Sequence, residues 1–192
     1  MDFVQKTVVL VKPDGVKRGL VGEILTRFEK VGLKIVAMKM VWEDAALVGE
    51  HYKDDADYHK MVGVKTLESY SKYGFDAGET LGTTNPLEIG KLVRKWNMDF
   101  LSSGPVVAIL LEGENSVEIV RKMMGHTFPQ VAVPGTIRGD LGLESAMASN
   151  FKKRSTKNLV HASGTVDEAE FERKLWFREK EIYDYKRVGE DE

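Results

Sequence analysis

Residues 7–42 decide the fold, and they read TVVLVKPDGVKRGLVGEILTRFEKVGLKIVAMKMVW. The opening run, Thr7 to Val11, is rich in β-branched residues and predicts a buried strand that ends in a turn at Pro13-Asp14-Gly15. The apolar residues that follow recur at helical spacing until Gly32, and residues 33–42 then return to a strand pattern. The stretch therefore predicts a β-α-β unit.

A second unit of the same kind follows further along the chain. The run PVVAILL, residues 105–111, predicts a third strand, and Gly113-Glu114 is expected to turn the chain out of it. Asn115, with Glu118 three residues later, is expected to cap a helix that closes at Gly125.

A fourth strand and a last helix complete this second unit. The strand is expected within residues 158–162, beginning after Asn158. Thr165-Val-Asp-Glu168 has the T-x-x-E form of a capping box, so a helix should begin near Val166. Two successive β-α-β units predict an α+β, ferredoxin-like βαββαβ sandwich, in which two helices cover one face of a four-stranded antiparallel sheet.

Two segments, at about 53–99 and 142–157, do not belong to this core. The first should be helical, because Thr84-Asn85-Pro86 is a helix start signal followed by an apolar stripe. The second contains a basic run, Lys152 to Lys157, for which a solvated loop is the expected state. We expect one domain over residues 1–192, with these two segments as insertions.

Composition sets the broad class of the protein. The chain is 42% hydrophobic and 30% charged, with a net charge of −2 and no cysteine. These values are typical of a soluble globular protein and argue against a global basic field for nucleic acid. The absence of cysteine also excludes a cysteine nucleophile and a metal site with cysteine ligands. Because no apolar run is long enough to span a membrane, a cytoplasmic protein is expected.

The stretch NLVHASGT, residues 158–165, carries a histidine within an apolar, strand-like run. Taken alone, His161 is more readily explained as a core histidine bonded to backbone. However, Glu172 interrupts the apolar stripe of the last helix, and a carboxylate placed there needs a partner. His161 is a candidate for that partner, and Ser163 points to the same side of an extended strand. The alternative is a Glu172 that contacts a lysine or a backbone N–H.

Several cations are suited to phosphate. Lys12 follows the first strand, and Arg138 lies in the Gly-containing loop PGTIRGD. The alternatives are an exposed turn lysine and an arginine that is paired with Asp140. Arg121 lies beside the apolar stripe of a helix and by itself indicates nothing. The chain has neither a Walker A motif nor the protein-kinase motifs, so any phosphate would be handled by side-chain cations and a histidine.

Four separate motifs, in this order, resemble those of the nucleoside diphosphate kinase family. They are VKPDGVKRGLVGEIL, SGPVVAILLEG, PGTIRGD and NLVHAS, followed by LWF and a final DY. The resemblance covers residues 7–52 and 100–185 apart from the two insertions. It implies a ferredoxin-like phosphotransferase that moves the γ-phosphate of a nucleoside triphosphate to a nucleoside diphosphate by a ping-pong mechanism.

The resemblance also implies a role for each matching residue. His161 matches the nucleophile that becomes phosphohistidine, Ser163 and Glu172 match the residues that support its ring, and Tyr52 matches a tyrosine beside it. The residues that match the nucleotide-binding set are Lys12, Arg121, Thr127, Arg138 and Asn158. Mg²⁺ is expected on the nucleotide phosphates rather than on protein ligands. The expected partners are ATP and other nucleoside di- and triphosphates, and the expected assembly is a homo-oligomer, either a hexamer or a tetramer.

The chain departs from the family pattern at two places. His161-Ala-Ser-Gly164 replaces the common HGSD, which changes the local hydrogen bonding but not the nucleophile. The aromatic residue that clamps the base falls where the first insertion begins, and either Tyr58 or Met61 is a candidate for that role. Two other functions compete with the active kinase, namely a catalytically silent nucleotide-binding module and a nucleic-acid-binding protein that uses residues 151–157.

Overall fold

The computed structural model describes residues 3–188, and its internal contacts divide the chain into two compact units. The first unit is formed by residues 3–41, 106–124 and 160–188. The second unit is formed by residues 42–105 and 125–159. Both predicted insertions, at about 53–99 and 142–157, therefore lie within the second unit.

The first unit is built on a four-stranded sheet. Its strands are β1 (Val4–Val11), β2 (Lys34–Val41), β3 (Val106–Glu114) and β4 (Val160–Ala162). Their order is β2-β3-β1-β4, and every neighbouring pair is antiparallel. This is the order of the ferredoxin-like βαββαβ arrangement, so the predicted fold class is confirmed.

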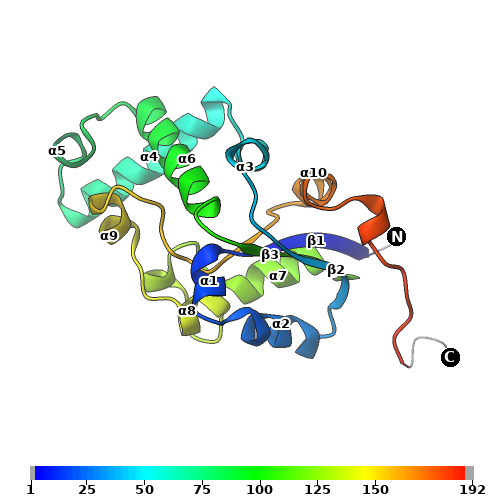
Figure 1. Cartoon of the computed structure of the whole chain (residues 1–192). Coiled ribbons are helices and arrows are strands. Elements are labelled where there is room, and N and C mark those ends of the chain that lie inside the picture. The colour runs from blue at the N-terminus through cyan, green and yellow to red at the C-terminus, as the bar shows by residue number, and fades with distance from the viewer. Residues whose placement is uncertain (1–2, 189–192) are drawn as a thin grey trace. The chain divides into compact units, whose positions relative to one another are not determined.

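Helices cover both faces of this sheet. They are α1 (Pro13–Lys17), α2 (Val21–Lys30), α7 (Ser116–Met124) and α10 (Val166–Trp176), with a 3₁₀ turn at Glu179–Glu181. Figure 1 shows α2 and α7 on one side of the sheet, as predicted, and α10 on the other. The central strands form the core, because residues 8–11 and 108–111 have no exposed surface. Each Val, Leu or Ile side chain among them contributes roughly 1.5–3 kcal/mol by leaving water.

Two local predictions in the first unit were wrong. The expected turn at Pro13-Asp14-Gly15 is the helix α1, because Pro13 occupies the first helical turn, where its missing N–H costs nothing. The residues Gly113 and Glu114, expected to form a turn, are instead the last two residues of β3, because β1 begins at Val4 and pairs with them. Asn115 directly precedes α7, as expected of its cap, and its carbonyl accepts from the N–H of Ile119 at 3.0 Å, although its φ is +49°.

The second unit is helical within the first insertion, as predicted. It contains α3 (Ala45–His51), α4 (Ala56–Tyr73), α5 (Ala77–Leu81), α6 (Pro86–Leu101), α8 (Ile137–Leu141) and α9 (Ala146–Phe151), with a 3₁₀ turn at Pro129–Val131. The predicted start of α6 is confirmed, because Asn85 caps it by accepting from the N–H of Leu87.

The two predicted insertions share one small hydrophobic core. Tyr70 and Ala77, from the first insertion, are buried together with Met147 from the second. The ring of Phe151 also packs edge-on against Phe75, with centroids 5.0 Å apart. The two insertions, although far apart in the sequence, therefore pack against each other within the second unit.

None of the helices within residues 3–188 combines the length and the apolar character that a membrane crossing requires.

Candidate active site

His161 lies at the centre of β4, opposite Leu10 of β1, and its side chain is partly buried. Its Nε2 atom is 2.7 Å from Oε1 of Glu172 on α10. Glu172 is only 5% exposed, so its carboxylate depends on bonded partners rather than on water. The predicted pairing between the strand histidine and the helix carboxylate is present in the structure.

Ser163 holds the other oxygen of the same carboxylate. Its Oγ donates to Glu172 Oε2 at 2.6 Å and accepts from the N–H of Val8 at 3.2 Å. The side chain has no exposed surface. The carboxylate is thus fixed on one side by the serine, which is itself fixed by the backbone of β1.

This bonding selects a tautomer of the imidazole. An ionised carboxylate only accepts hydrogen bonds, so Nε2 of His161 carries the hydrogen and donates to Glu172. In the neutral ring, the lone pair then resides on Nδ1. In this tautomer Nδ1 is the ring nitrogen that is chemically able to act as a nucleophile.

Two predicted cations belong to the same unit as His161. Lys12 directly follows Val11, which pairs with Val160, so Lys12 lies at the end of the sheet where β4 begins. Lys12 is 8% exposed, so the alternative interpretation of an exposed lysine in a turn is wrong. Arg121 is an exposed residue of α7, and this helix packs against β1 and β4.

Three predicted nucleotide-binding residues are joined by hydrogen bonds in the second unit. Arg138 is buried and donates from Nε to the carbonyl of Asn158 at 3.1 Å and from Nη1 to that of Gly125. The side-chain amide of Asn158 donates to the carbonyl of Thr127 at 2.8 Å. Asp140, the alternative partner of Arg138, accepts from the N–H of Gly135. The loop PGTIRGD is thus tied to the start of NLVHAS.

Leu159 is a residue that sequence reasoning missed. It has φ +70° and is 1% exposed, although a branched apolar side chain strongly disfavours this backbone region. Such strain persists where the surroundings determine the conformation, and here it falls between Asn158 and the first residue of β4. A leucine in the sequence does not indicate a positive φ, so this conformation could not be predicted. The expectation that the strand begins after Asn158 is confirmed.

Tyr52 directly follows α3, and hydrogen bonds to the backbone hold it in position. Its carbonyl accepts from Nε of Arg94 on α6 at 3.2 Å, and Arg94 also binds the carbonyl of Gly49. The ring packs edge-on against His51, with centroids 4.9 Å apart. Tyr52 is therefore anchored to α6 within the second unit.

The two candidates for the base clamp differ in their surroundings. A surface hollow of about 380 Å³ lies on α4 and is lined by Asp57, Lys60, Met61, Val64, Lys65 and Glu68. Met61 is 46% exposed in this hollow, whereas the ring of Tyr58 packs against that of His59. Of the two candidates, Met61 is therefore the more exposed side chain.

The basic run before Asn158 is not uniformly solvated. Lys152, Lys153 and Lys157 are exposed, as expected of a loop, but Arg154 is paired with Glu144. Glu144 was also missed by sequence reasoning, because a single acidic residue outside a periodic element carries no pattern. Although burial raises the pKa of Glu144, hydrogen bonds from Arg154 and the N–H of Lys157 lower it to about 2.

The variant motif HASG is accommodated without disruption. The methyl group of Ala162 is buried in β4, which pairs regularly with β1. The N–H of Gly164 donates to the carboxylate of Glu168 at 2.9 Å, and Thr165 caps α10 as predicted. The absence of the common acidic residue thus leaves the histidine, serine and glutamate contacts in place.

Comparisons with known proteins agree with this geometry. The family model described as nucleoside diphosphate kinase matches residues 5–67 and 90–182. A nucleoside diphosphate kinase from Pyrobaculum aerophilum is 44% identical over 179 residues, which cover 93% of this chain and 98% of that protein. The crystal structure of an NDP kinase from the same organism has a TM-score of 0.91 at 42% identity and covers 94% of this chain and 100% of its own.

A second solved structure extends the comparison to a liganded state. The Borrelia burgdorferi nucleoside diphosphate kinase, described as a transition-state mimic with bound vanadate and ADP, has a TM-score of 0.75 at 37% identity. It covers 96% of this chain and 94% of its own. The resemblance drawn from the motifs is confirmed, and the chain belongs to the nucleoside diphosphate kinase family of phosphotransferases.

Proposed function

We propose that this phosphotransferase works through a phosphohistidine at His161. In the first half-reaction, Nδ1 attacks the γ-phosphorus of a nucleoside triphosphate, and the bond to the bridging oxygen breaks to release the nucleoside diphosphate. In the second, an oxygen of an acceptor nucleoside diphosphate attacks the same phosphorus and breaks the P–N bond. The observation that carries the proposal is the bond between Nε2 of His161 and the buried carboxylate of Glu172.

This bond serves catalysis in two ways. It keeps the hydrogen on Nε2, so that the Nδ1 lone pair needs no separate base to expose it. As the P–N bond forms, positive charge develops on the ring, and the adjacent carboxylate stabilises that charge. Ser163 positions Glu172 for both purposes by donating to its second oxygen.

The nucleotide-binding roles follow the family pattern. By the family pattern, Arg121, Thr127 and Arg138 bind phosphate oxygens. Lys12 and Asn158 contact the ribose end and help align the phosphate, and Tyr52 takes the role of the tyrosine that the family places beside its histidine. Arg138 can combine its backbone bonds with a phosphate contact, because a guanidinium offers several N–H donors. Met61 is the proposed surface for the base, supported by the hollow on α4.

Mg²⁺ belongs to this proposal as a companion of the nucleotide. The proposed nucleotide-binding side chains are cations and neutral groups, whereas Mg²⁺ prefers carboxylate and phosphate oxygens. The carboxylate of Glu172 already accepts bonds at both oxygens. The residues therefore fit an ion that is held by the phosphates, where it neutralises part of their charge.

Assembly and location complete the proposal. A homo-oligomer, either a hexamer or a tetramer, is supported by β2, which is an edge strand on which Met38 and Met40 are more than half exposed. Light scattering of the purified protein would measure the number of subunits. A cytoplasmic location would be tested by fractionating cells that express the tagged chain.

The mechanism is tested by incubating the protein with Mg²⁺ and γ-labelled ATP in the absence of an acceptor. The wild type should acquire an acid-labile, base-stable label, and dTDP should discharge it, whereas His161→Ala should acquire none. A wild type that binds ADP but acquires no label would instead identify a silent nucleotide-binding module.

A further inference from the structure

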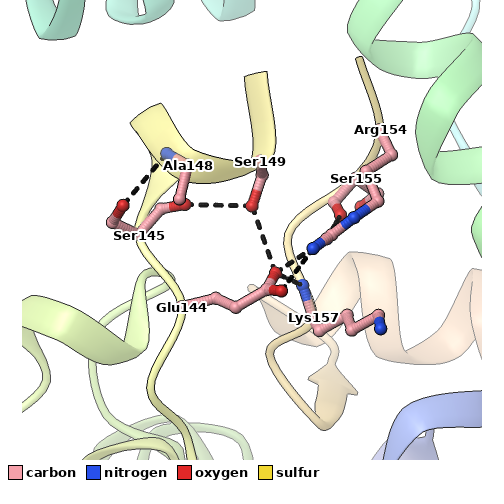
Figure 2. A network of polar contacts seen from close by, with 7 residues as sticks. All are labelled: Glu144, Ser145, Ala148, Ser149, Arg154, Ser155 and Lys157. Atoms are coloured by element: carbon pink, nitrogen blue, oxygen red, sulfur yellow. Dashed lines mark hydrogen bonds and ion pairs between the residues drawn. The ribbon is translucent and has the colours of Figure 1, made fainter. Parts of the chain in front are cut away.

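Glu144 is the centre of a polar network just before α9, shown in Figure 2. Both terminal nitrogens of Arg154 donate to its carboxylate. The backbone N–H of Lys157 donates to Oε2 at 2.9 Å, and the hydroxyl of Ser149 donates at 3.2 Å. One side chain thus joins the start of the 142–157 segment to its end.

The hydrogen bonds of this network are partly shielded from water and involve charged groups. The side chain of Glu144 is 22% exposed and that of Arg154 is 29% exposed, so water competes only partly for these bonds. Hydrogen bonds to a charged group are stronger than neutral ones. Since the pKa of Glu144 is about 2, the carboxylate keeps its charge at any pH at which an enzyme is normally assayed.

The backbone of Glu144 reaches a second part of the chain. Its carbonyl accepts from the N–H of Gln130 at 3.2 Å. Gln130 lies three residues after Thr127, and Lys157 directly precedes Asn158. The side-chain amide of Asn158 bonds to the carbonyl of Thr127. Glu144 therefore ties together the two backbone segments that this amide bond connects.

We infer that Glu144 is a positioning residue that holds Asn158 and Thr127 in register for nucleotide binding. It acts on the nucleotide through these two residues. The inference rests on the proposed function, because that function assigns nucleotide contacts to Asn158 and Thr127. The inference also assigns a role to residues 142–157. Their hydrogen bonds fix the backbone that directly precedes Asn158.

The test compares the wild type with Glu144→Gln in three measurements. Calorimetry gives the affinity for ADP, and γ-labelled ATP gives the rate of His161 labelling. Phosphoramidate, a phosphoryl donor without a nucleoside, gives the same rate in the absence of contacts to the ribose and base. Glu144→Gln should bind ADP about tenfold more weakly and should be labelled by subsaturating ATP more slowly by a similar factor. Its labelling by phosphoramidate should slow by a clearly smaller factor, because this donor has no ribose end for Asn158 to contact.

Two further variants sharpen the comparison. Arg154→Gln removes the ion pair but leaves the bond from the Lys157 N–H, so its ADP affinity should fall by less, about threefold. It also carries the test if Glu144→Gln does not fold. Glu112→Gln is the matched control, because Glu112 is a partly buried carboxylate that pairs with Lys6 and Lys34 in the first unit. It should leave ADP affinity unchanged.

Three results would overturn the inference. These are an unchanged ADP affinity in Glu144→Gln, a parallel fall in ATP and phosphoramidate labelling, and an equal loss of affinity in Glu112→Gln. Failure of the proposed function would look different, since the wild type would then acquire no label from either donor. The ADP affinities would still decide the role of Glu144 in that case.

Discussion

At the scale of single residues, His161 and Glu172 share one hydrogen bond on which the proposed chemistry depends. Glu172→Gln keeps the size of the side chain but removes the charge that stabilises the developing imidazolium. A hydrogen bond to a charged group contributes about 1.5–3 kcal/mol, so His161 phosphorylation by ATP should slow by roughly 10- to 150-fold. Rapid-quench measurement of label formation at saturating ATP would give this rate.

The affinity for ADP separates this effect from a general defect. Glu172 contacts His161 and Ser163 and has no proposed contact with the nucleotide, so Glu172→Gln should bind ADP as tightly as the wild type. A normal labelling rate would show that the carboxylate is structural only. Loss of ADP binding in proportion to the rate would place Glu172 in nucleotide recognition instead.

The same residues show what sequence reasoning detects at this scale. Glu172 was predicted because a carboxylate on an apolar helical stripe is costly and needs a partner. Glu144 and Leu159 were missed, because one lies outside any periodic pattern and the other holds its strained backbone through tertiary surroundings. The bond from Arg138 to the carbonyl of Asn158 spans 20 residues, a separation that no local pattern specifies.

At the scale of elements, α4 and α6 pack so closely that glycine is required between them. A Cβ atom on Gly90 of α6 would lie 1.9 Å from the backbone oxygen of His59 on α4. Because the obstacle is backbone, the helices would have to separate, so Gly90→Ala should destabilise the protein by about 1–3 kcal/mol or more. Urea unfolding followed by circular dichroism would measure the change in the free energy of unfolding.

Gly22 provides the matched control for this substitution. It is the second residue of the helix α2, and a Cβ atom there would meet nothing within 4 Å. Gly22→Ala should therefore stabilise the protein by about 0.5–1 kcal/mol through the entropy of the unfolded chain. Equal effects of the two substitutions would rule out helix packing as the cause.

Elements with strong periodicity or caps were predicted well, and short ones were not. The helix α2 and the capped starts of α6 and α10 follow from apolar spacing and from Asn85 and Thr165. α1 was predicted as a turn, because five residues with Pro, Asp and Gly carry the signals of both structures. The end of β3 depends on its pairing with β1, which lies far away in the sequence.

At the scale of the whole molecule, paired carboxylates make stability depend on pH. Interactions lower the folded-state pKa values of Glu112, Glu144, Glu170 and Glu181, reaching about 2 for Glu144 and Glu170. Lowered values favour the folded state above the ordinary pKa of 4.5, and this stability is lost as pH falls toward 2. The unfolding temperature should thus be nearly constant from pH 6 to 5 and should fall between about pH 4.5 and 2.

Calorimetry at a series of pH values would measure this profile, with Glu144→Gln beside the wild type. The variant should show a shallower fall below about pH 4.5, because one of the contributing carboxylates is gone. An identical slope in both proteins would mean that Glu144 contributes nothing to the acid transition.

The long-range organisation of the second unit was only partly predictable. The helical nature of the first insertion follows from its stripe and start signal, but the two insertions were predicted separately. The structure joins them through the contacts of Met147 and Phe151 with the first insertion. Hydrophobic residues in separate segments do not specify which segment they pack against.

The position of phosphate on the His161 ring is the most direct test of the proposed mechanism. Heteronuclear NMR of the ¹⁵N-histidine-labelled phosphoprotein distinguishes the two ring isomers. Because Nε2 is held by Glu172, the phosphate should be on Nδ1. Phosphate on Nε2, or on a residue other than His161, would contradict the proposed role of the Glu172 bond and the mechanism built on it.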